Sequence, residues 1–283
     1  MIEFLKAVLF GIVEGITEWL PISSTGHMIL LDEFVKLDVS PEFWEMFLVV
    51  IQLGAILAVV VLFWNQIWPF GRKYNPCPVK QEGFLSWCKK DTFIMWFKII
   101  IACLPAAVVG LFFDEFFESL FYNGVCVAIA LIVFGIGFIL IENRNRQMNV
   151  KVSSLSEISY KTALIIGLFQ LIAAIFPGTS RSGATILGAL MIGVSRTVAA
   201  EFTFFLAIPV MLGASLLKVL KFGFSFTGNE LMILLIGMAT AFIVSIIVIR
   251  FLMGYIKKHD FKVFGWYRIV LGIVVLVYFG IRG

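Results

Sequence analysis

The chain has 283 residues, of which 61% are hydrophobic and 14% are charged, and its mean hydropathy is +1.03. A soluble domain of this length has close to a quarter charged residues, so the composition excludes an ordinary soluble protein and indicates an integral membrane protein. The net charge of +4 is small and scattered, and no nucleic-acid partner is expected. The N-terminus lacks a basic segment and a small-residue cleavage site, so no secretory signal is expected.

Six apolar runs are each long enough to cross a bilayer, which takes roughly 20 residues. In chain order, these expected transmembrane helices are 43–64, 93–113, 122–142, 199–217, 231–252 and 264–281. Two further apolar segments, 2–31 and 160–194, are interrupted near their centres by proline, glycine and hydroxyl residues. Each is either a kinked span or a re-entrant hairpin that turns at mid-membrane and leaves on the side that it entered.

The basic residues favour the re-entrant alternative. With two re-entrant hairpins, loops 65–92, 143–161 and 253–263 share one face and carry twelve lysines and arginines, whereas the other face carries five. Cytoplasmic loops of membrane proteins are enriched in basic residues, so this asymmetry places the first face in the cytoplasm and both termini outside. The predicted fold is therefore an all-α integral membrane protein with six transmembrane helices plus two re-entrant helical hairpins.

The two interrupted segments are similar in sequence. GIVEGITEWLPISST (11–25) aligns with GLFQLIAAIFPGTSR (167–181) at an offset of 156, and further matches follow in the same order at an offset of 159. Two ordered matches with a short insertion between them indicate an internal duplication. We expect one half at about 1–142 and the other at about 160–283, together forming a single membrane domain over residues 1–283.

The predicted topology makes the two halves an inverted repeat. Three spans follow the hairpin in each half, and this odd number turns the second half over relative to the first. Inverted repeats with interrupted helices place a binding site near the membrane midplane. The hairpin tips Pro21–His27 and Pro177–Gly183 should therefore face each other, so that their polar groups pool where the tips touch.

The first interrupted segment carries Glu14 and Glu18, which share one face of a helix because they are four residues apart. In a purely structural reading, one carboxyl is protonated and the other is hydrogen-bonded to a neighbour. Ionisable groups within a membrane are functional candidates by default. Paired carboxylates suit a hard divalent cation such as Mg²⁺ or Ca²⁺, which makes Glu14 and Glu18 the predicted metal ligands, although a proton relay would also use them.

The first tip, PISSTGH, offers three hydroxyl groups and a histidine: Ser23, Ser24, Thr25 and His27. A helix N-cap accounts for one or two of the hydroxyl groups but not for the histidine. Ser24 and His27 are three residues apart, close enough in a helical turn for the histidine to activate the hydroxyl. Serine attack is favoured, and direct attack by His27 or by metal-bound water stays open.

The second tip, PGTSRSGAT, places Arg181 among hydroxyl residues. An arginine at mid-membrane is costly and indicates an anion, unless it forms a structural salt bridge to Glu14, Glu18 or Glu201. Its guanidinium matches phosphate oxygens, and glycines with the N–H groups of a new helix form an anion cradle. The predicted phosphate-binding residues from both tips are Arg181, Ser180, Thr179, Ser182, Thr185, Ser23 and Thr25.

Two stretches, EGITEWLPISSTGH and PGTSRSG, closely resemble the signature motifs of bacterial undecaprenyl-pyrophosphate phosphatases of the bacitracin-resistance type. The resemblance spans essentially the whole chain. It implies a multi-pass enzyme of the bacterial cytoplasmic membrane that hydrolyses the C55 lipid diphosphate to the monophosphate and phosphate, recycling the carrier lipid for cell-wall synthesis. It also implies catalytic roles for Glu14, Glu18, Ser24, His27 and Arg181, a divalent cation as cofactor, and a site that acts at the outer leaflet.

A second function class fits the same architecture. Interrupted helices in an inverted repeat are typical of transporters, so the alternative is a transporter or flippase of a phosphorylated polyprenyl lipid. Phosphate release in detergent separates the two, because transport needs a sealed membrane and hydrolysis does not. The expected partners are the polyprenyl pyrophosphate substrate and membrane lipid, and the sequence leaves open whether the chain forms a homodimer.

Overall fold

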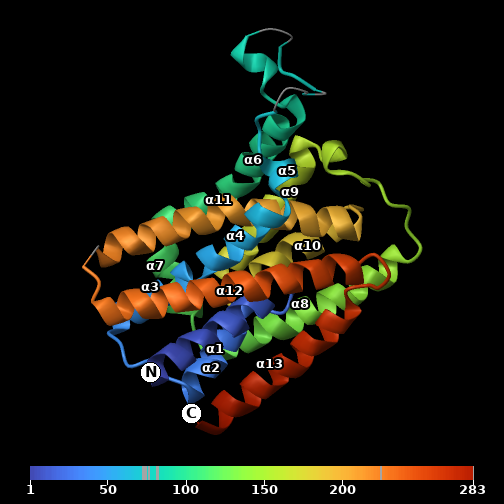
Figure 1. The fold of residues 1–283 in the computed structure, drawn as a ribbon. Coiled ribbons are helices and arrows are strands. Elements are labelled where there is room, and N and C mark those ends of the chain that lie inside the picture. Colours follow the sequence, from blue (N-terminus) through green and yellow to red (C-terminus); the bar gives the residue numbers. More distant parts are fainter. Residues whose placement is uncertain (72–74, 76, 81–82, 224, 283) are drawn as a thin grey trace.

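The computed structural model describes residues 1–71, 75, 77–80, 83–223 and 225–282 (Figure 1). Within these residues every regular element is a helix, and the β-type pairs are isolated bridges. The helices are α1 (Ile2–Thr17), α2 (Ser24–Phe34), α3 (Pro41–Val50), α4 (Gln52–Leu62), α5 (Trp64–Ile67), α6 (Lys90–Phe112), α7 (Asp114–Phe121), α8 (Gly124–Asn145), α9 (Tyr160–Ile175), α10 (Arg181–Met191), α11 (Arg196–Phe222), α12 (Gly228–Tyr255) and α13 (Lys262–Arg282), with short 3₁₀ helices at Phe84–Ser86 and Leu155–Glu157.

Among the described residues, six helical segments are long and apolar enough to cross a membrane, as the sequence predicted. They are α3 with α4, then α6, α8, α11, α12 and α13. Large apolar side chains along them are exposed, and on one face of α8 the exposed fractions are 50% for Ile129, 55% for Val133 and 61% for Leu140. An apolar face this exposed is covered by lipid in a membrane protein, so the chain is an all-α, multi-pass membrane protein.

Each interrupted segment forms two helices whose outer ends lie side by side. At the ends of α1 and α2, Lys6 Nζ donates to the main-chain carbonyl of Lys36 at 2.6 Å. In the second pair, the main-chain N–H of Lys151, in the connection that leads to α9 (Tyr160–Ile175), donates to the carbonyl of Gly193 just after α10 at 2.9 Å. Each pair is therefore a helical hairpin that begins and ends at one end of the bundle.

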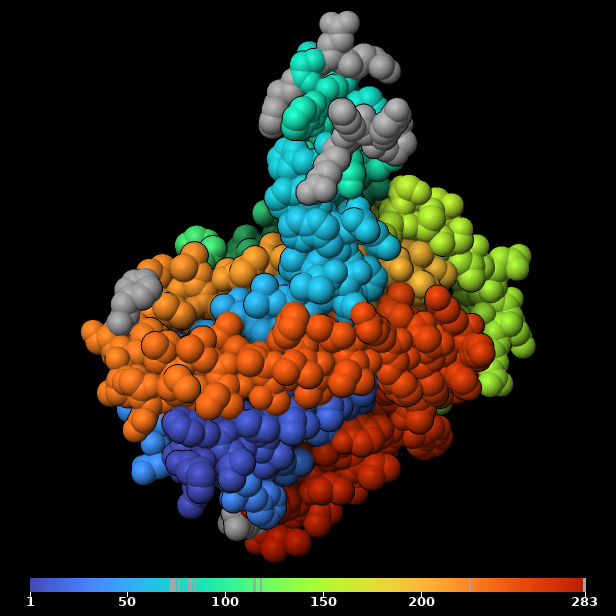
Figure 2. All heavy atoms as spheres, viewed as in Figure 1, coloured from blue at the N-terminus to red at the C-terminus, as the bar shows by residue number. Residues whose placement is uncertain are grey.

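The two hairpins begin at opposite ends of the bundle (Figure 1). The first begins at the end that holds both chain termini, and the second begins near the connections that follow α8 and α12. The segment around α5 and the start of α6 extends beyond the bundle (Figure 2). Of the basic residues counted in loop 65–92, Arg72 and Lys73 lie outside the described residues.

The hairpin in each half of the chain contacts a transmembrane helix of the other half. α1 packs on α12, and α9 packs on α6, so each hairpin packs against a span of the other half. Gly11 and Gly167, which the sequence alignment pairs, lie at these two crossings. A Cβ on Gly11 would lie 2.6 Å from the carbonyl oxygen of Gly237, and one on Gly167 would overlap the backbone of Ala102. Equivalent glycines at equivalent crossings are the packing expected of a duplicated chain.

A second glycine pair brings α13 against α8. A Cβ on Gly135 would lie 2.7 Å from the carbonyl oxygen of Gly265, so only glycines allow this close approach. The crossing brings Arg268 of α13 into the interior, where it is 0% exposed. The fold therefore places α13 next to the two hairpin tips, although α13 belongs to neither hairpin.

Gly11→Ala should lower the free energy of unfolding by about 1–3 kcal/mol, because the added methyl meets a main-chain carbonyl that moves only if α12 moves. Gly110→Ala is the matched control, since open space surrounds that position in α6. Helix propensity alone should make the control neutral or more stable by up to about 1 kcal/mol. Thermal unfolding of both variants in detergent measures the difference, and equal responses would contradict the α1–α12 packing.

Candidate active site

The two hairpin tips turn in the same way. Ser23 and Ser180 have φ angles of 75° and 68°, in the left-handed region that costs an ordinary residue roughly 1–2 kcal/mol. Each serine caps the next helix: Ser23 Oγ accepts from the N–H of Gly26 at 3.3 Å, and Ser180 Oγ accepts from that of Gly183 at 3.1 Å. The structure thus pairs Ser23 with Ser180, one position beyond the sequence alignment. Both α2 and α10 begin at the tips, where free N–H groups favour an anion.

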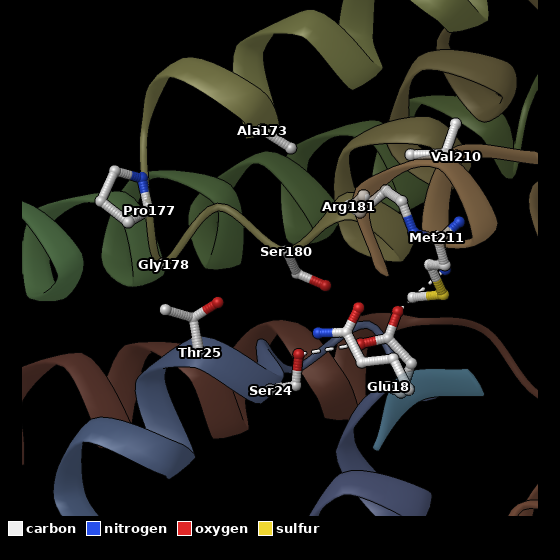
Figure 3. Close-up of a pocket in the computed structure, with 12 residues that line it drawn as sticks. Glu18, Ser24, Thr25, Ala173, Pro177, Gly178, Ser180, Arg181, Val210 and Met211 are labelled. Atoms are coloured by element: carbon white, nitrogen blue, oxygen red, sulfur yellow. Dashed lines mark hydrogen bonds and ion pairs between the residues drawn. The ribbon is translucent and has the colours of Figure 1, made fainter. Parts of the chain in front are cut away.

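A cavity of about 170 Å³ lies between the tips. Ser24 and Thr25 of α2 face Ser180 and Gly178 of the second tip across it (Figure 3). The other residues that line the cavity are Glu18, Gln52, Ala173, Pro177, Arg181, Val210, Met211 and Ala214. The predicted meeting of the two tips therefore encloses a small, partly polar space.

Glu18 links the polar groups of both tips. Its Oε2 accepts from Ser24 Oγ at 2.9 Å, and its Oε1 accepts from Arg181 Nη2 at 2.9 Å (Figure 3). The Glu18 and Arg181 side chains are 6% and 13% exposed. Removing either partner of such a buried pair leaves an uncompensated charge, which is strongly destabilising. The salt-bridge alternative for Arg181 is thus realised, and the same ion pair holds the guanidinium at the cavity wall.

Several polar atoms around the cavity have no hydrogen-bond partner in the part of the chain that the structure describes. They include Glu14 Oε1, Thr179 Oγ1 and Arg181 Nε, all of them buried. Glu14 is 1% exposed and lies within electrostatic range of Glu18 and Arg181. A buried polar group without a partner costs about 1–3 kcal/mol. Of these three residues only Arg181 lines the cavity, whereas Glu14 and Thr179 are buried behind its wall.

The predicted phosphate-binding residues divide into two groups. Thr25, Ser180 and Arg181 line the cavity. The other four, which are buried behind its wall instead of lining it, are Ser23, Thr179, Ser182 and Thr185. Ser182 Oγ donates to the main-chain carbonyl of Glu18 at 3.0 Å, and Thr185 Oγ1 donates to that of Arg181 at 2.9 Å. Ser182 therefore satisfies a carbonyl at the turn after α1, and Thr185 bonds within α10 itself.

The expected contact between His27 and Ser24 is not formed. His27 Nδ1 lies 2.7 Å from the carbonyl oxygen of Ser23, and Nε2 lies 2.7 Å from the hydroxyl of Tyr267. A carbonyl oxygen only accepts, so Nδ1 carries the proton and Nε2 of the neutral ring accepts from the tyrosine. Both ring nitrogens are therefore engaged, and His27 has no free lone pair for the Ser24 proton.

Sequence reasoning missed three residues of this region. Gln52 lines the cavity, Tyr267 holds His27, and Arg268 is fully buried against both tips. The signal for Arg268 was present, because an arginine inside the apolar run 264–281 is as costly as Arg181 in its own segment. For Gln52 the signal was an amide side chain inside the apolar run 43–64.

The fold and the site together define a multi-pass membrane protein with an arginine, a carboxylate and a serine hydroxyl held between two helical hairpins. Residues 7–274 match the family model described as bacitracin resistance protein BacA. The chain belongs to this family, as its two motifs predicted.

Relatives cover nearly the whole chain. An undecaprenyl-diphosphatase of Desulfitobacterium hafniense is 66% identical over 282 residues, which cover 100% of this chain and 98% of the relative. Undecaprenyl-diphosphatase 1 of Clostridium acetobutylicum is 64% identical over 98% of each chain. An undecaprenyl-diphosphatase of Enterococcus faecalis is 62% identical over 98% of this chain and 97% of the relative.

Inorganic pyrophosphate at 100 times its Kd should stabilise the protein by about 2.7 kcal/mol, because the cavity presents a guanidinium and two helix N-termini. Arg181→Lys should abolish this effect, since one ammonium cannot bond to Glu18 and to an anion in the planar geometry of a guanidinium. Arg196→Lys is the control, because Arg196 pairs with Glu142 outside the cavity. Thermal unfolding with and without pyrophosphate measures the stabilisation of each protein. If pyrophosphate stabilised the Arg181→Lys variant as much as the native protein, that result would contradict an anion site in the cavity.

Proposed function

We propose that this chain hydrolyses undecaprenyl (C55) diphosphate to undecaprenyl phosphate and phosphate, recycling the carrier lipid for cell-wall synthesis. The observation that carries the proposal is the hydrogen-bonded series Ser24–Glu18–Arg181 at a cavity between two hairpin tips. Relatives that are 62–66% identical over nearly the full chain are named for this activity.

Ser24 is the nucleophile in this proposal, and Glu18 is its base. Ser24 Oγ attacks the terminal phosphorus while its proton passes to Glu18 Oε2, 2.9 Å away. The bond from that phosphorus to the bridging oxygen breaks, and undecaprenyl phosphate leaves with the electron pair. Water then attacks the phosphorus and the bond to Ser24 Oγ breaks; Ser24 Oγ takes back the proton held by Glu18, and the oxygen and both protons of the water leave with the phosphate. The occupied nitrogens of His27 favour this route over attack or base catalysis by the histidine.

Arg181 supplies the positive charge for the phosphoryl oxygens. Its Nε is buried without a partner among the described residues, while Nη2 bonds to Glu18. The guanidinium therefore stays fixed by the protein and still has donor capacity. Thr25 and Ser180 add hydroxyl groups from opposite sides of the same cavity. A donor set fixed before the substrate arrives stabilises the charge that develops during phosphoryl transfer.

Glu14 and Glu18 are the proposed ligands of a divalent cation, Mg²⁺ or Ca²⁺. The buried, unpartnered oxygen of Glu14 fits this role, because a carboxylate held in an apolar interior requires a cation or a proton. In the described part of the chain no group of three or more histidine, cysteine, aspartate or glutamate side chains could hold a metal ion. The remaining ligands would be substrate phosphate oxygens and water, as is usual for Mg²⁺. When bound, the cation neutralises charge on the diphosphate.

The proposed location is the bacterial cytoplasmic membrane, with both hairpins re-entrant and the site open toward the outer leaflet. The lengths of α2 and α10 support the re-entrant hairpins, because each helix has 11 residues. A helix of that length covers roughly 16 Å, about half of the 30 Å hydrocarbon core. The hairpin geometry supports it as well, since each helix pair begins and ends at one end of the bundle.

Purified protein in detergent should release phosphate from C55 diphosphate, and a chelator should lower the rate at least about 100-fold. Glu14→Gln should lose at least about 100-fold even with excess Mg²⁺, because an amide cannot supply the negative charge. Glu45→Gln, at an exposed carboxylate paired with Lys218, should keep native turnover. Absence of phosphate release from the native protein, with lipid movement in sealed vesicles, would favour the transporter or flippase instead.

Cysteine labelling tests the orientation in a background without the native cysteines. Lys258→Cys should be shielded from an impermeant reagent in intact cells, because it lies in the basic connection before α13. Asn229→Cys, at the start of α12, should react. Both positions are exposed, so accessibility within the fold does not bias the comparison. Labelling of Lys258→Cys from outside would overturn the orientation.

A further inference from the structure

Arg268 of α13 is bound by main-chain carbonyls of both hairpin tips. Its Nη1 donates to the carbonyl of Pro21 at 3.2 Å, and its Nη2 donates to those of Gly178 and Thr179 at 3.0 and 2.6 Å. Nε donates to the carbonyl of Leu131 on α8 at 3.5 Å. Within the described residues its hydrogen bonds involve no carboxylate, so carbonyl dipoles satisfy this fully buried charge, together with the ring of Phe134, whose centroid lies 5.7 Å from Arg268 Cζ.

These carbonyls follow the C-terminal ends of α1 and α9. A helix carries partial negative charge at its C-terminal end, so a cation between two such ends is stabilised by both. The N-terminal ends of α2 and α10 begin at the cavity, where Ser24 and Arg181 are their first residues. Arg268 thus satisfies carbonyls of the turns that follow α1 and α9, and the N-terminal ends of α2 and α10 remain available to an anion in the cavity.

The preceding residue of α13 makes a second connection to the first tip. Tyr267 bonds to His27 Nε2, and His27 Nδ1 bonds to the carbonyl of Ser23, the residue before Ser24. The second tip is shaped to admit the arginine, because a Cβ on Gly183 would lie 2.8 Å from Arg268 Nη1. Two consecutive residues of α13 therefore contact the tips on the side away from the cavity: Tyr267 contacts the first tip, and Arg268 contacts both.

We propose that Arg268, together with Tyr267, is a positioning clamp for the hydrolysis proposed above. Neither residue lines the cavity, so each acts through the tips and not on the substrate. The clamp fixes the first tip relative to the second and thereby sets Ser24 against Arg181. Without it, three tip carbonyls lose their donor in an apolar interior, and the tips move to satisfy them. His27 is then part of the clamp and not the base.

Steady-state kinetics of Arg268→Gln and Arg268→Lys test the clamp. A displacement of about 1 Å costs roughly 100-fold in rate, so kcat should fall about 100-fold in the glutamine variant. The lysine variant should lose about 10-fold, because one nitrogen cannot bond to both tips, and KM should stay within about threefold in both. Native kcat in either folded variant would overturn the proposal.

Arg196→Gln is the matched control for a lost guanidinium. It breaks the ion pair with Glu142, which ties α11 to α8 away from the cavity. It should lower the thermal midpoint and leave kcat within about threefold of native. A loss of kcat in this control as large as that in Arg268→Gln would overturn the proposal, since any damage to the bundle would then suffice.

Tyr267→Phe tests the other half of the clamp. Removing the hydroxyl should lower kcat about 10-fold, because His27 then loses a partner and the first tip loosens. Tyr278→Phe is the control on the same helix, where the hydroxyl bonds to Glu33 at 3.1 Å, and it should stay within about threefold of native. Equal kcat values for the two variants would contradict the role of Tyr267.

A double variant separates positioning from general damage. If the clamp acts through Ser24, Arg268→Lys combined with Ser24→Ala should be no slower than Ser24→Ala alone, within about threefold. Independent damage would instead multiply the two losses and overturn the proposal.

Hydrogen exchange measures the tips without reference to activity. Amides in peptides covering 18–27 and 176–183 should exchange at least about 10-fold faster in Arg268→Lys, and at the native rate in Arg196→Gln. Unchanged tip exchange in Arg268→Lys would overturn the clamp whatever the enzyme's activity. Faster tip exchange in a chain whose native form releases no phosphate would overturn only the proposed function.

Discussion

The cost of interrupting a helix inside an apolar bundle governs this structure. Where α1 passes into α2, and α9 into α10, main-chain groups lose their helical partners. In hydrocarbon each such group costs several kcal/mol unless a protein group satisfies it. The hydroxyls of Ser23 and Ser180 satisfy N–H groups, and Arg268 satisfies carbonyls. Most polar side chains of the tips are used to stabilise the two turns, and the site consists of the polar groups that remain.

Because most polar tip residues satisfy main-chain groups, few of them face the cavity. Ser182 and Thr185 bond to main-chain carbonyls, and Thr203 extends the same network by donating to Thr185 at 2.9 Å. Ser24 is bound through Glu18, and Arg181 is bound through Glu18 and the main-chain carbonyl of Thr203, which leaves Arg181 Nε without a partner among the described residues. A rigid supporting layer behind a few incompletely satisfied groups is the arrangement that fixes catalytic geometry before substrate binds.

The internal repeat supplies the architecture, while differences between its halves supply the chemistry. Glu14 aligns with Gln170, and both are buried, at 1% and 2% exposed. Gln52 aligns with Met211, and both line the cavity. The first half contributes the carboxylates and the second half contributes the arginine. A symmetric site would hold like charges that repel, whereas this asymmetry pairs opposite charges across the junction.

The sequence by itself determined the six spans and the two interrupted segments, and it singled out Glu18, Ser24 and Arg181, which meet at the cavity. Hydropathy and the high cost of a polar group in a membrane segment reveal these without knowledge of any neighbour. Only the tertiary structure decided which hydroxyls face the cavity and what His27 does. Outside regular helices the direction of a side chain depends on local φ, which is positive at both tip serines. The partner of His27 is 240 residues away, and Arg268 matters because helix packing brings carbonyls from both tips to it, which no local pattern encodes.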